Sequence, residues 1–367
     1  MDGTDRRAIG FDTIEFRKAN RRLTERHAIR NRFVLNCDRR HEPGITEGPR
    51  RSPRSLAARW DLYGEAVTYE ILDERFRPCT NGDVALERLS GGYRWSEGPV
   101  YVPAGRYVLW SDIPNDRMLR FDELTGRVGP FRQPAGYTNG NTLDRQGRLV
   151  SCEHGQRRVT RTEHDGSITV LAERHDGKRL NSPNDVVVRA DGTVWFTDPS
   201  YGIASDYEGY QAESEIGACH VYVIDPLTAE CRIAADDFDR PNGLAFSLDH
   251  RRLYIADTRA NHIRVFDVAD GGKLSGGDVF ASCTAGAFDG LRLDSVGRVW
   301  TSAGDGVHCY DPDGTLIGKI LVPEVVANLE FGGPKRNRLF ICATTSVYSI
   351  MLSVSGARWA WTADDGR

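Results

Sequence analysis

Short apolar runs separated by tight polar turns fill the chain from about residue 80 onward, and no helical period persists there. One pattern recurs six times: an aliphatic start, a tight polar or glycine turn, then an apolar run that usually ends in an aromatic residue. Short runs rich in β-branched and aromatic residues, bounded by turn residues, predict β-strands. The six copies are 103–110, 144–150, 190–195, 248–254, 294–300 and 335–340.

The spacing of these copies predicts their arrangement. Their ends lie 40 to 59 residues apart, and repeats of about 40 to 50 residues with two hairpins are typical of propeller blades. A second set of turn residues follows five of the six copies, where the turn between a third and a fourth strand belongs. We therefore predict an all-β fold, a six-bladed β-propeller, in which the segment from Val84 to Leu89 supplies an outer strand to the last blade. The longest interval contains an insertion, 201–216, which we expect to cover the channel mouth.

A polar side chain stands at the equivalent point of all six units, 9 to 13 residues before the end of each copy. Because the innermost strand of a blade lines the central channel, these side chains should converge on one mouth. Two carboxylates among neutral amides suit a hard cation such as calcium, whereas zinc favours His or Cys. Ordinary turn chemistry is the alternative for any one of them. The six residues are Glu97, Asn141, Asn184, Asn242, Asp289 and Asn328.

The N-terminal part differs in composition from the rest. Residues 1–64 hold 15 Lys and Arg against 9 Asp and Glu, a net charge of +6, whereas the whole chain carries -4. Such a segment, with few aromatic residues and no periodicity, is typical of disorder. We expect residues 1–67 to be a basic N-terminal extension and residues 68–367 to form the propeller. A nucleic-acid-binding arm and a start codon placed too far upstream are alternatives for the extension.

The charge, cysteines and hydropathy of the chain limit which binding partners and which cellular compartment we expect. The small net charge does not indicate a nucleic-acid partner, and no apolar run is long enough for a membrane span or a secretory signal. The eight cysteines are widely spaced, without zinc-finger spacing, so free thiols are expected. We therefore expect a cytoplasmic protein without nucleic-acid or membrane partners, as a monomer or weak homodimer.

The sequence resembles the gluconolactonase family, the SMP-30, gluconolactonase and regucalcin-like lactonases, over about residues 68 to 350. The resemblance is carried by 96–99 (SEGP), 140–142 (GNT), 152–155 (CEHG), 179–186 (RLNSPNDV), 195–199 (WFTDP) and 241–244 (PNGL). It implies a propeller that holds one divalent ion, calcium by expectation and Mg²⁺, Mn²⁺ or Zn²⁺ as alternatives. The implied ligands are Glu97, Asn242 and Asp289, with Asn184 as a further amide. Regucalcin has an arginine two residues before the amide that corresponds to Asn184, whereas this chain has Ser182 there. The sugar preference of regucalcin therefore cannot be assigned to this protein.

The implied reaction is metal-dependent hydrolysis of a small-molecule sugar lactone, such as D-glucono-1,5-lactone, to the aldonic acid. Asp289 is the candidate general base as well as a ligand, and Asp185 is a candidate for proton transfer. A turn or supporting role is the alternative for Asp185. Asn184 and Asn141 are candidates to hold ring oxygens. His154 is a candidate substrate contact, although a structural role is favoured because a lone histidine has no visible catalytic partner.

Other hydrolase classes lack their motifs. Arg94 stands where a nucleophile elbow around Ser96 would need its first glycine, and no H-E-x-x-H or P-loop sequence occurs. Two alternatives remain open. One is a calcium-dependent phosphotriesterase of the diisopropyl fluorophosphatase kind, and the other is a propeller that binds partners without catalysis.

Overall fold

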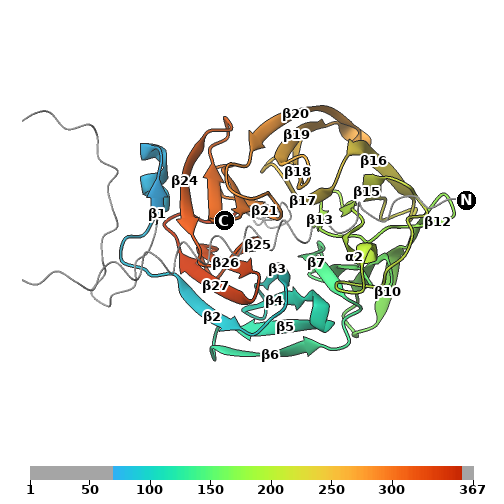
Figure 1. The fold of residues 1–367 in the computed structure, drawn as a ribbon, viewed down its shortest axis with the longest axis horizontal. Coiled ribbons are helices and arrows are strands. Elements are labelled where there is room, and N and C mark those ends of the chain that lie inside the picture. The colour runs from blue at the N-terminus through green and yellow to red at the C-terminus, as the bar shows by residue number, and fades with distance from the viewer. Residues whose placement is uncertain (1–68, 358–367) are drawn as a thin grey trace, which may run out of the picture. The chain divides into compact units, whose positions relative to one another are not determined.

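The computed structural model describes residues 69–357, and the expected N-terminal extension, residues 1–67, lies outside them. Six antiparallel sheets are arranged radially around a common axis (Figure 1). The predicted all-β, six-bladed β-propeller is confirmed. Each of the six repeated patterns overlaps the second strand of one blade.

Blades 1 to 4 are simple meanders in which each strand pairs with the next one along the chain. Blade 1 consists of β3 (Ser96–Val102), β4 (Tyr107–Asp112), β5 (Arg117–Asp122) and β6 (Arg127–Arg132). Blade 2 consists of β7 (Thr138–Leu143), β8 (Leu149–Glu153), β9 (Arg158–Thr162) and β10 (Ile168–Ala172). Blade 3 consists of β13 (Val186–Val188), β14 (Val194–Asp198), β15 (Cys219–Ile224) and β16 (Cys231–Phe238). Blade 4 consists of β17 (Pro241–Phe246), β18 (Arg252–Asp257), β19 (His262–Val268) and β20 (Leu274–Ser282).

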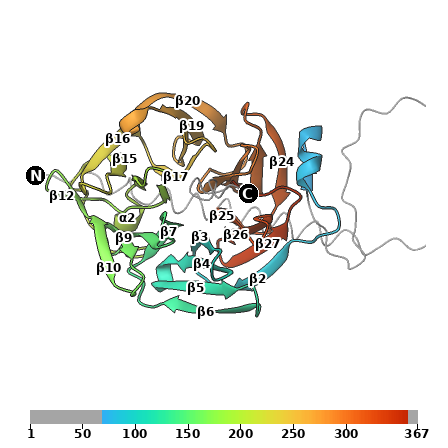
Figure 2. The same cartoon turned by 180° about the vertical axis from the view of Figure 1, so that it is seen from behind.

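Blades 5 and 6 each contain a strand from the start of the described chain. Blade 5 consists of β21 (Leu291–Leu293), β22 (Val299–Ala303), β23 (Gly306–Tyr310) and β24 (Leu316–Leu321), with β1 (Tyr69–Ile71) added at its outer edge. Blade 6 consists of β25 (Val326–Gly332), β26 (Arg338–Ala343), β27 (Ser346–Met351) and then β2 (Glu87–Gly91). Figure 2 shows β2 beside β27. The predicted closure of the ring is confirmed, and it explains why the sixth unit lacks an outer hairpin turn.

Within residues 69–357, few elements lie outside the blades. They are the 3-10 helices η1 (Glu74–Cys79), η2 (Ile113–Asn115) and η3 (Asp270–Gly272), the short helix α2 (Tyr201–Ala204), and the two-stranded ribbon of β11 (Arg174–His175) and β12 (Lys178–Arg179). None of the helices in residues 69–357 is both long and apolar enough to cross a membrane.

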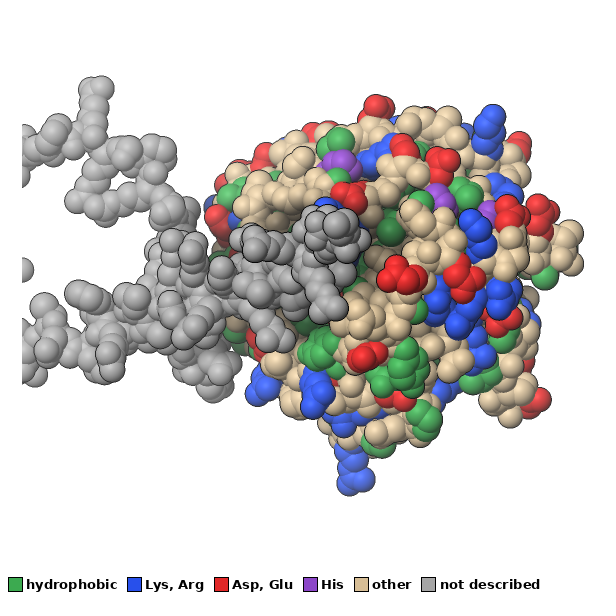
Figure 3. Space-filling model, turned by 45° about the vertical axis from the view of Figure 1, so that its right-hand side comes forward, with side chains coloured by type: hydrophobic (Ala, Val, Ile, Leu, Met, Phe, Trp, Pro, Cys, Tyr) green, Lys and Arg blue, Asp and Glu red, His purple; other side chains and the backbone are tan. Residues whose placement is uncertain are grey.

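The apolar core is divided among the interfaces between blades. Trp195 and Val223 of blade 3, for example, pack with Leu253 and Ile255 of blade 4 in one cluster. The blade-ending aromatic residues of the sequence pattern are fully buried there, and removing such a side chain costs about 3–5 kcal/mol. Among the described cysteines, none forms a disulfide. On the face seen in Figure 3, acidic and basic side chains are interspersed.

Candidate active site

Glycines beside the predicted site residues let the inner strands of neighbouring blades touch. The Gly243 N–H donates to the Asp289 carbonyl (3.0 Å), and the Gly290 N–H donates to the Ala327 carbonyl (2.8 Å). A Cβ on Gly243 would lie 2.3 Å from the Asp289 carbonyl oxygen, and one on Gly290 would lie 2.1 Å from the Asn328 side chain. Only glycine permits this approach, which brings polar side chains of successive blades together.

Buried carboxylates at the ends of second strands hold the loops that lead to the mouth. Asp198 accepts hydrogen bonds from the backbone N–H groups of residues 181 and 182, both at 2.8 Å, and so fixes the approach to Asn184. The same arrangement recurs in blades 1 and 4. Sequence reasoning missed this role, although an acid two or three residues after the aromatic marker was a visible signal. The three carboxylates are Asp112, Asp198 and Asp257.

Glu97 and Asp289 are the two carboxylates of the predicted ring. Glu97 is 3% exposed, and its Oε2 accepts hydrogen bonds from the Gly98 N–H (2.5 Å) and from Asn328 Nδ2 (3.0 Å). Burial raises the pKa of Glu97, and the charge of Asp185 adds to this shift. Burial followed by the Glu97 charge raises the pKa of Asp289 well above its usual range. Two carboxylates that disfavour each other's ionisation would be stabilised by a cation between them.

The two amides predicted to join them are held differently. Asn242 Nδ2 donates to Thr258 Oγ1 (2.9 Å), and the Thr258 hydroxyl donates to the Phe288 carbonyl (2.9 Å). Asn242 also lowers the pKa of Asp289, against the larger effect of burial. The side-chain amide of Asn184 is 94% buried and makes no hydrogen bond to any residue in 69–357, so it is free for a ligand.

Asn141 lies in the same ring, but its amide is already used by the protein. Its Nδ2 lies within hydrogen-bond distance of the carbonyls of Gly98 (2.9 Å) and Asn139 (2.8 Å) and of Ser111 Oγ (3.1 Å), while its Oδ1 accepts from Ser151 Oγ (2.6 Å). These contacts join blades 1 and 2. A substrate contact by Asn141 stays a prediction. To bind substrate, its amide would have to give up one of these hydrogen bonds.

Asp185, next to Asn184, is buried with one oxygen unsatisfied. Its Oδ1 accepts a hydrogen bond from the Val186 N–H (2.9 Å), whereas its Oδ2 makes no hydrogen bond. The guanidinium of Arg292 lies 3.6 Å from Oδ2. Burial raises the pKa of Asp185, and Arg292 opposes that shift.

His154 lies under the insertion. Its Nε2 is 3.3 Å from Asn139 Nδ2, and its Nδ1 is 3.2 Å from the Glu208 carbonyl oxygen. A Cβ on Gly202 would lie 2.5 Å from the ring, so the insertion packs directly on it. Burial lowers the pKa of His154 to about 4. These contacts support the structural role, and a direct contact with substrate stays a prediction.

The neutral state of His154 predicts a specific loss of stability in acid. Since the unfolded histidine has a pKa near 6.5, the unfolded chain takes up a proton below that pH, which the folded protein resists until about pH 4. Between pH 7 and pH 5 wild-type protein should lose about 2 kcal/mol of stability that the His154→Gln variant keeps. Denaturant unfolding at both pH values measures this. His164→Gln, at an exposed turn, is the matched control, and equal pH dependence in His154→Gln and wild type would contradict the assignment.

The insertion contributes two side chains that sequence reasoning did not name. Burial raises the pKa of Glu208 to about 7, and its charge adds to the raised pKa of both Glu97 and Asp289. Burial and then the Asp289 charge raise the pKa of Tyr201, and the guanidinium carbon of Arg240 lies 5.0 Å from the centre of the Tyr201 ring. The insertion's length and its tyrosines and acids were the only signal.

The donor set fits a hard cation. Residues 69–357 contain no group of three His, Cys, Asp or Glu side chains arranged for a metal ion. An ion here would therefore need amide oxygens beside Glu97 and Asp289, which Asn242 and Asn184 can supply. Carboxylate and amide oxygens together are calcium ligands, and the absence of His and Cys from this set disfavours zinc.

The structure thus combines a six-bladed β-propeller with buried acids and amides on its inner strands. The family model described as the SMP-30/Gluconolactonase/LRE-like region matches residues 95–345, so the chain belongs to this family. The resemblance stated from the sequence is confirmed.

Three relatives are similar over most of their length. A gluconolactonase of Zymomonas mobilis is 28% identical over 299 residues, 74% of this chain and 82% of that protein. A pentonolactonase of Haloferax volcanii is 29% identical over 68% of this chain and 81% of its own. A solved gluconolactonase structure from Xanthomonas campestris is 38% identical, with a TM-score of 0.73, over 77% of this chain and 93% of that one.

Proposed function

We propose that the protein is a metal-dependent lactone hydrolase that opens a sugar lactone, such as D-glucono-1,5-lactone, to the aldonic acid in carbohydrate metabolism. The observation that supports the proposal is the electrostatic interaction of buried Glu97 and Asp289 with each other and with Asp185, the neighbour of Asn184, while Asn242 also acts on Asp289. The relatives described above, named as gluconolactonase and pentonolactonase, support the reaction class.

One divalent cation, calcium by preference, would be held by Glu97, Asn242 and Asp289, with Asn184 as a further ligand or substrate contact. When bound, such an ion polarises the lactone carbonyl and favours ionisation of a nearby water. Mg²⁺ and Mn²⁺ are alternatives with the same oxygen preference, and Zn²⁺ fits the donors least well.

The chain's own residues supply positioning and proton transfer. Asp289, whose pKa is raised by burial, accepts the proton of the water that attacks the carbonyl carbon. The free amide of Asn184 donates a hydrogen bond to a lactone oxygen. The bond between the carbonyl carbon and the ring oxygen then breaks, and the proton that Asp289 accepted passes through Asp185 to the ring oxygen, which returns both carboxyl groups to their starting states. The product is the open-chain acid, with water fully accounted for.

Acid release at constant pH tests the proposal. Purified protein should open D-glucono-1,5-lactone above the spontaneous rate, lose activity with a chelator and regain it with calcium. Hydrolysis of a phosphotriester such as diisopropyl fluorophosphate, without lactone hydrolysis, would favour the phosphotriesterase alternative. Folded, calcium-loaded protein that turns over neither substrate would favour the non-catalytic one.

Glu208 should recognise sugar hydroxyls from above the mouth. The Glu208→Gln variant is expected to raise KM for D-glucono-1,5-lactone about tenfold with kcat within threefold, because it weakens a charge-assisted hydrogen bond worth about 1.4 kcal/mol. Hydrolysis of δ-valerolactone, which lacks hydroxyls, should not change. Steady-state kinetics on both lactones measure the effect, and Glu213→Gln, an exposed acid of the same insertion, is the control. An equal loss on both lactones would rule out hydroxyl recognition.

A further inference from the structure

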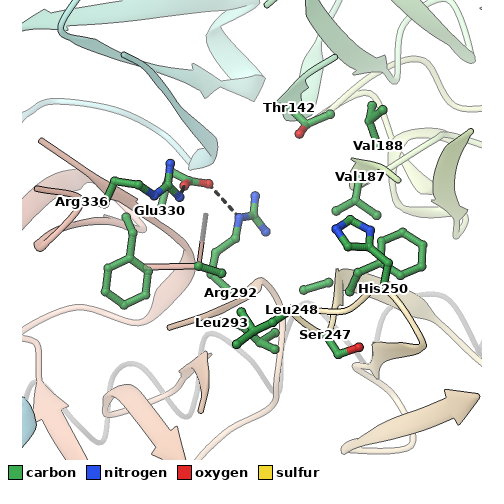
Figure 4. A pocket seen from close by; sticks show the side chains of 14 residues that line it. Thr142, Val187, Val188, Ser247, Leu248, His250, Arg292, Leu293, Glu330 and Arg336 are labelled. Atoms are coloured by element: carbon green, nitrogen blue, oxygen red, sulfur yellow. Dashed lines mark hydrogen bonds and ion pairs between the residues drawn. The ribbon is translucent and has the colours of Figure 1, made fainter. Parts of the chain in front are cut away.

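Arg292 lies below the mouth, three residues after Asp289 on the inner strand of blade 5. Its neighbours Leu291 and Leu293 are buried in the core between blades, and strand alternation therefore directs Arg292 toward the channel. Figure 4 shows its guanidinium projecting into a cavity of about 110 Å³, which is lined by the parts of the inner strands that follow the site residues.

The guanidinium of Arg292 joins two acids from opposite sides of the channel. Its Nε is 2.8 Å from Glu330 Oε2 on blade 6, and its Nη1 is 3.6 Å from Asp185 Oδ2 at the start of blade 3. The three side chains are 13%, 9% and 1% exposed. A buried chain of charges therefore runs from the floor of the channel up to the residue beside Asn184.

This arrangement gives each partner a separate role. Arg292 is the sole cation paired with Asp185 among residues 69–357, and Asp185 Oδ2 has no hydrogen-bond donor there. Glu330 occupies the Nε side of the guanidinium, and it is also 3.8 Å from Arg336 Nη2. Since a guanidinium is a rigid planar fork, fixing its Nε side fixes the direction of its Nη1 side. Glu330, together with the Leu291 carbonyl that accepts a hydrogen bond from Nη1 (2.8 Å), therefore orients Arg292 toward Asp185.

We propose that Arg292, held by Glu330, is a positioning residue for lactone hydrolysis, acting through the orientation of Asp185. The inference rests on the proposed function. The competing role is purely structural, in which the charges only close the channel. The two roles differ in one respect, because a positioning role makes the effects of changing Arg292 and Asp185 dependent on each other.

A double-mutant cycle tests this dependence. Asp185→Asn and Arg292→Met should each lower kcat about 100-fold, the range of a lost proton-transfer group, with KM within threefold. The double variant should be no slower than Asp185→Asn alone. It also leaves no unpaired charge at Asp185, and Glu330 keeps Arg336 at 3.8 Å, so it should fold even if Arg292→Met does not. Glu330→Gln should lower kcat in wild type but not in the Asp185→Asn background.

Matched variants complete the test. Arg292→Lys keeps the positive charge but not the planar guanidinium, so its kcat should lie between those of wild type and Arg292→Met. Arg252→Met, an exposed arginine, should have no effect, and thermal unfolding verifies folding in every case. Two results would overturn the inference and leave lactone hydrolysis in place. One is a double variant whose loss of kcat equals the product of the two single losses, and the other is an Asp185→Asn variant with the kcat of an active wild type. A wild-type protein without lactonase activity overturns the proposed function instead.

Discussion

Asp289→Asn should lower kcat for lactone hydrolysis by at least about 1,000-fold, the largest effect expected of any single substitution. Loss of a general base alone costs about 100- to 10,000-fold, and the same carboxylate is a candidate ligand of the cation. Glu97→Gln should also abolish activity at low calcium, but through the cation alone. Raising calcium should therefore restore part of the activity of Glu97→Gln and none of that of Asp289→Asn. Activity measured against calcium concentration at constant pH separates the two.

The control for this comparison is Asp191→Asn, which changes a carboxylate that is 47% exposed in the turn between β13 and β14. It should leave both kcat and the calcium dependence unchanged. Recovery of Asp289→Asn to within tenfold of wild type at high calcium would show that Asp289 is a ligand only. The base would then have to be sought elsewhere, with Asp185 and Glu208 as the remaining carboxylates of the mouth.

The blades could be predicted because the same pattern occurs at the second strand of each of the six blades. The strand supplied by residues Glu87–Gly91 was predictable for the same reason, because the ring lacked one outer strand. The edge strand Tyr69–Ile71 was not. It is three residues long and pairs with residues 318–320, about 250 positions away. Neither periodicity nor a nearby turn therefore indicates this strand in the sequence.

The candidate site follows from the sequence only where its residues occupy repeated positions. Glu97, Asn242 and Asp289 occupy equivalent positions in their blades, and the structure brings them to one mouth together with Asp185. Asn141 occupies an equivalent position too, yet its amide joins two blades, because register cannot distinguish a ligand from a structural contact. Glu208 comes from an insertion without a counterpart in other blades.

The channel floor escaped prediction for a different reason. Arg292 and Glu330 stand at ordinary strand positions, where a charged residue usually faces solvent. Only the closed ring turns their side chains inward and places them opposite Asp185. Long-range pairing of this kind depends on the arrangement of blades 3, 5 and 6, which no local pattern encodes.

Calcium should stabilise the protein strongly, raising its Tm by about 10 °C over protein kept in chelator. After burial, the charges of neighbouring acids raise the pKa values of Glu97 and Asp289 at the mouth, so without a cation the folded state holds acids that disfavour one another's ionisation. Calcium at about 1,000 times its Kd adds about 4 kcal/mol to the free energy of unfolding. Each kcal/mol raises the Tm of a domain of this size by roughly 2–4 °C. Thermal unfolding with calcium and with chelator measures the shift.

The Glu97→Gln variant distinguishes binding at the mouth from binding elsewhere. Removing one of the repelling carboxylates should make the variant more stable than wild type in chelator and nearly insensitive to calcium at the concentration that saturates wild type. A surface site would instead leave the calcium shift of Glu97→Gln equal to that of wild type. Magnesium should produce a smaller shift in wild type, because it gives up its water shell reluctantly and demands near-octahedral geometry. Opposite changes in metal-free stability and in calcium response would identify Glu97 as a residue whose buried charge destabilises the empty fold and is retained to hold the cation.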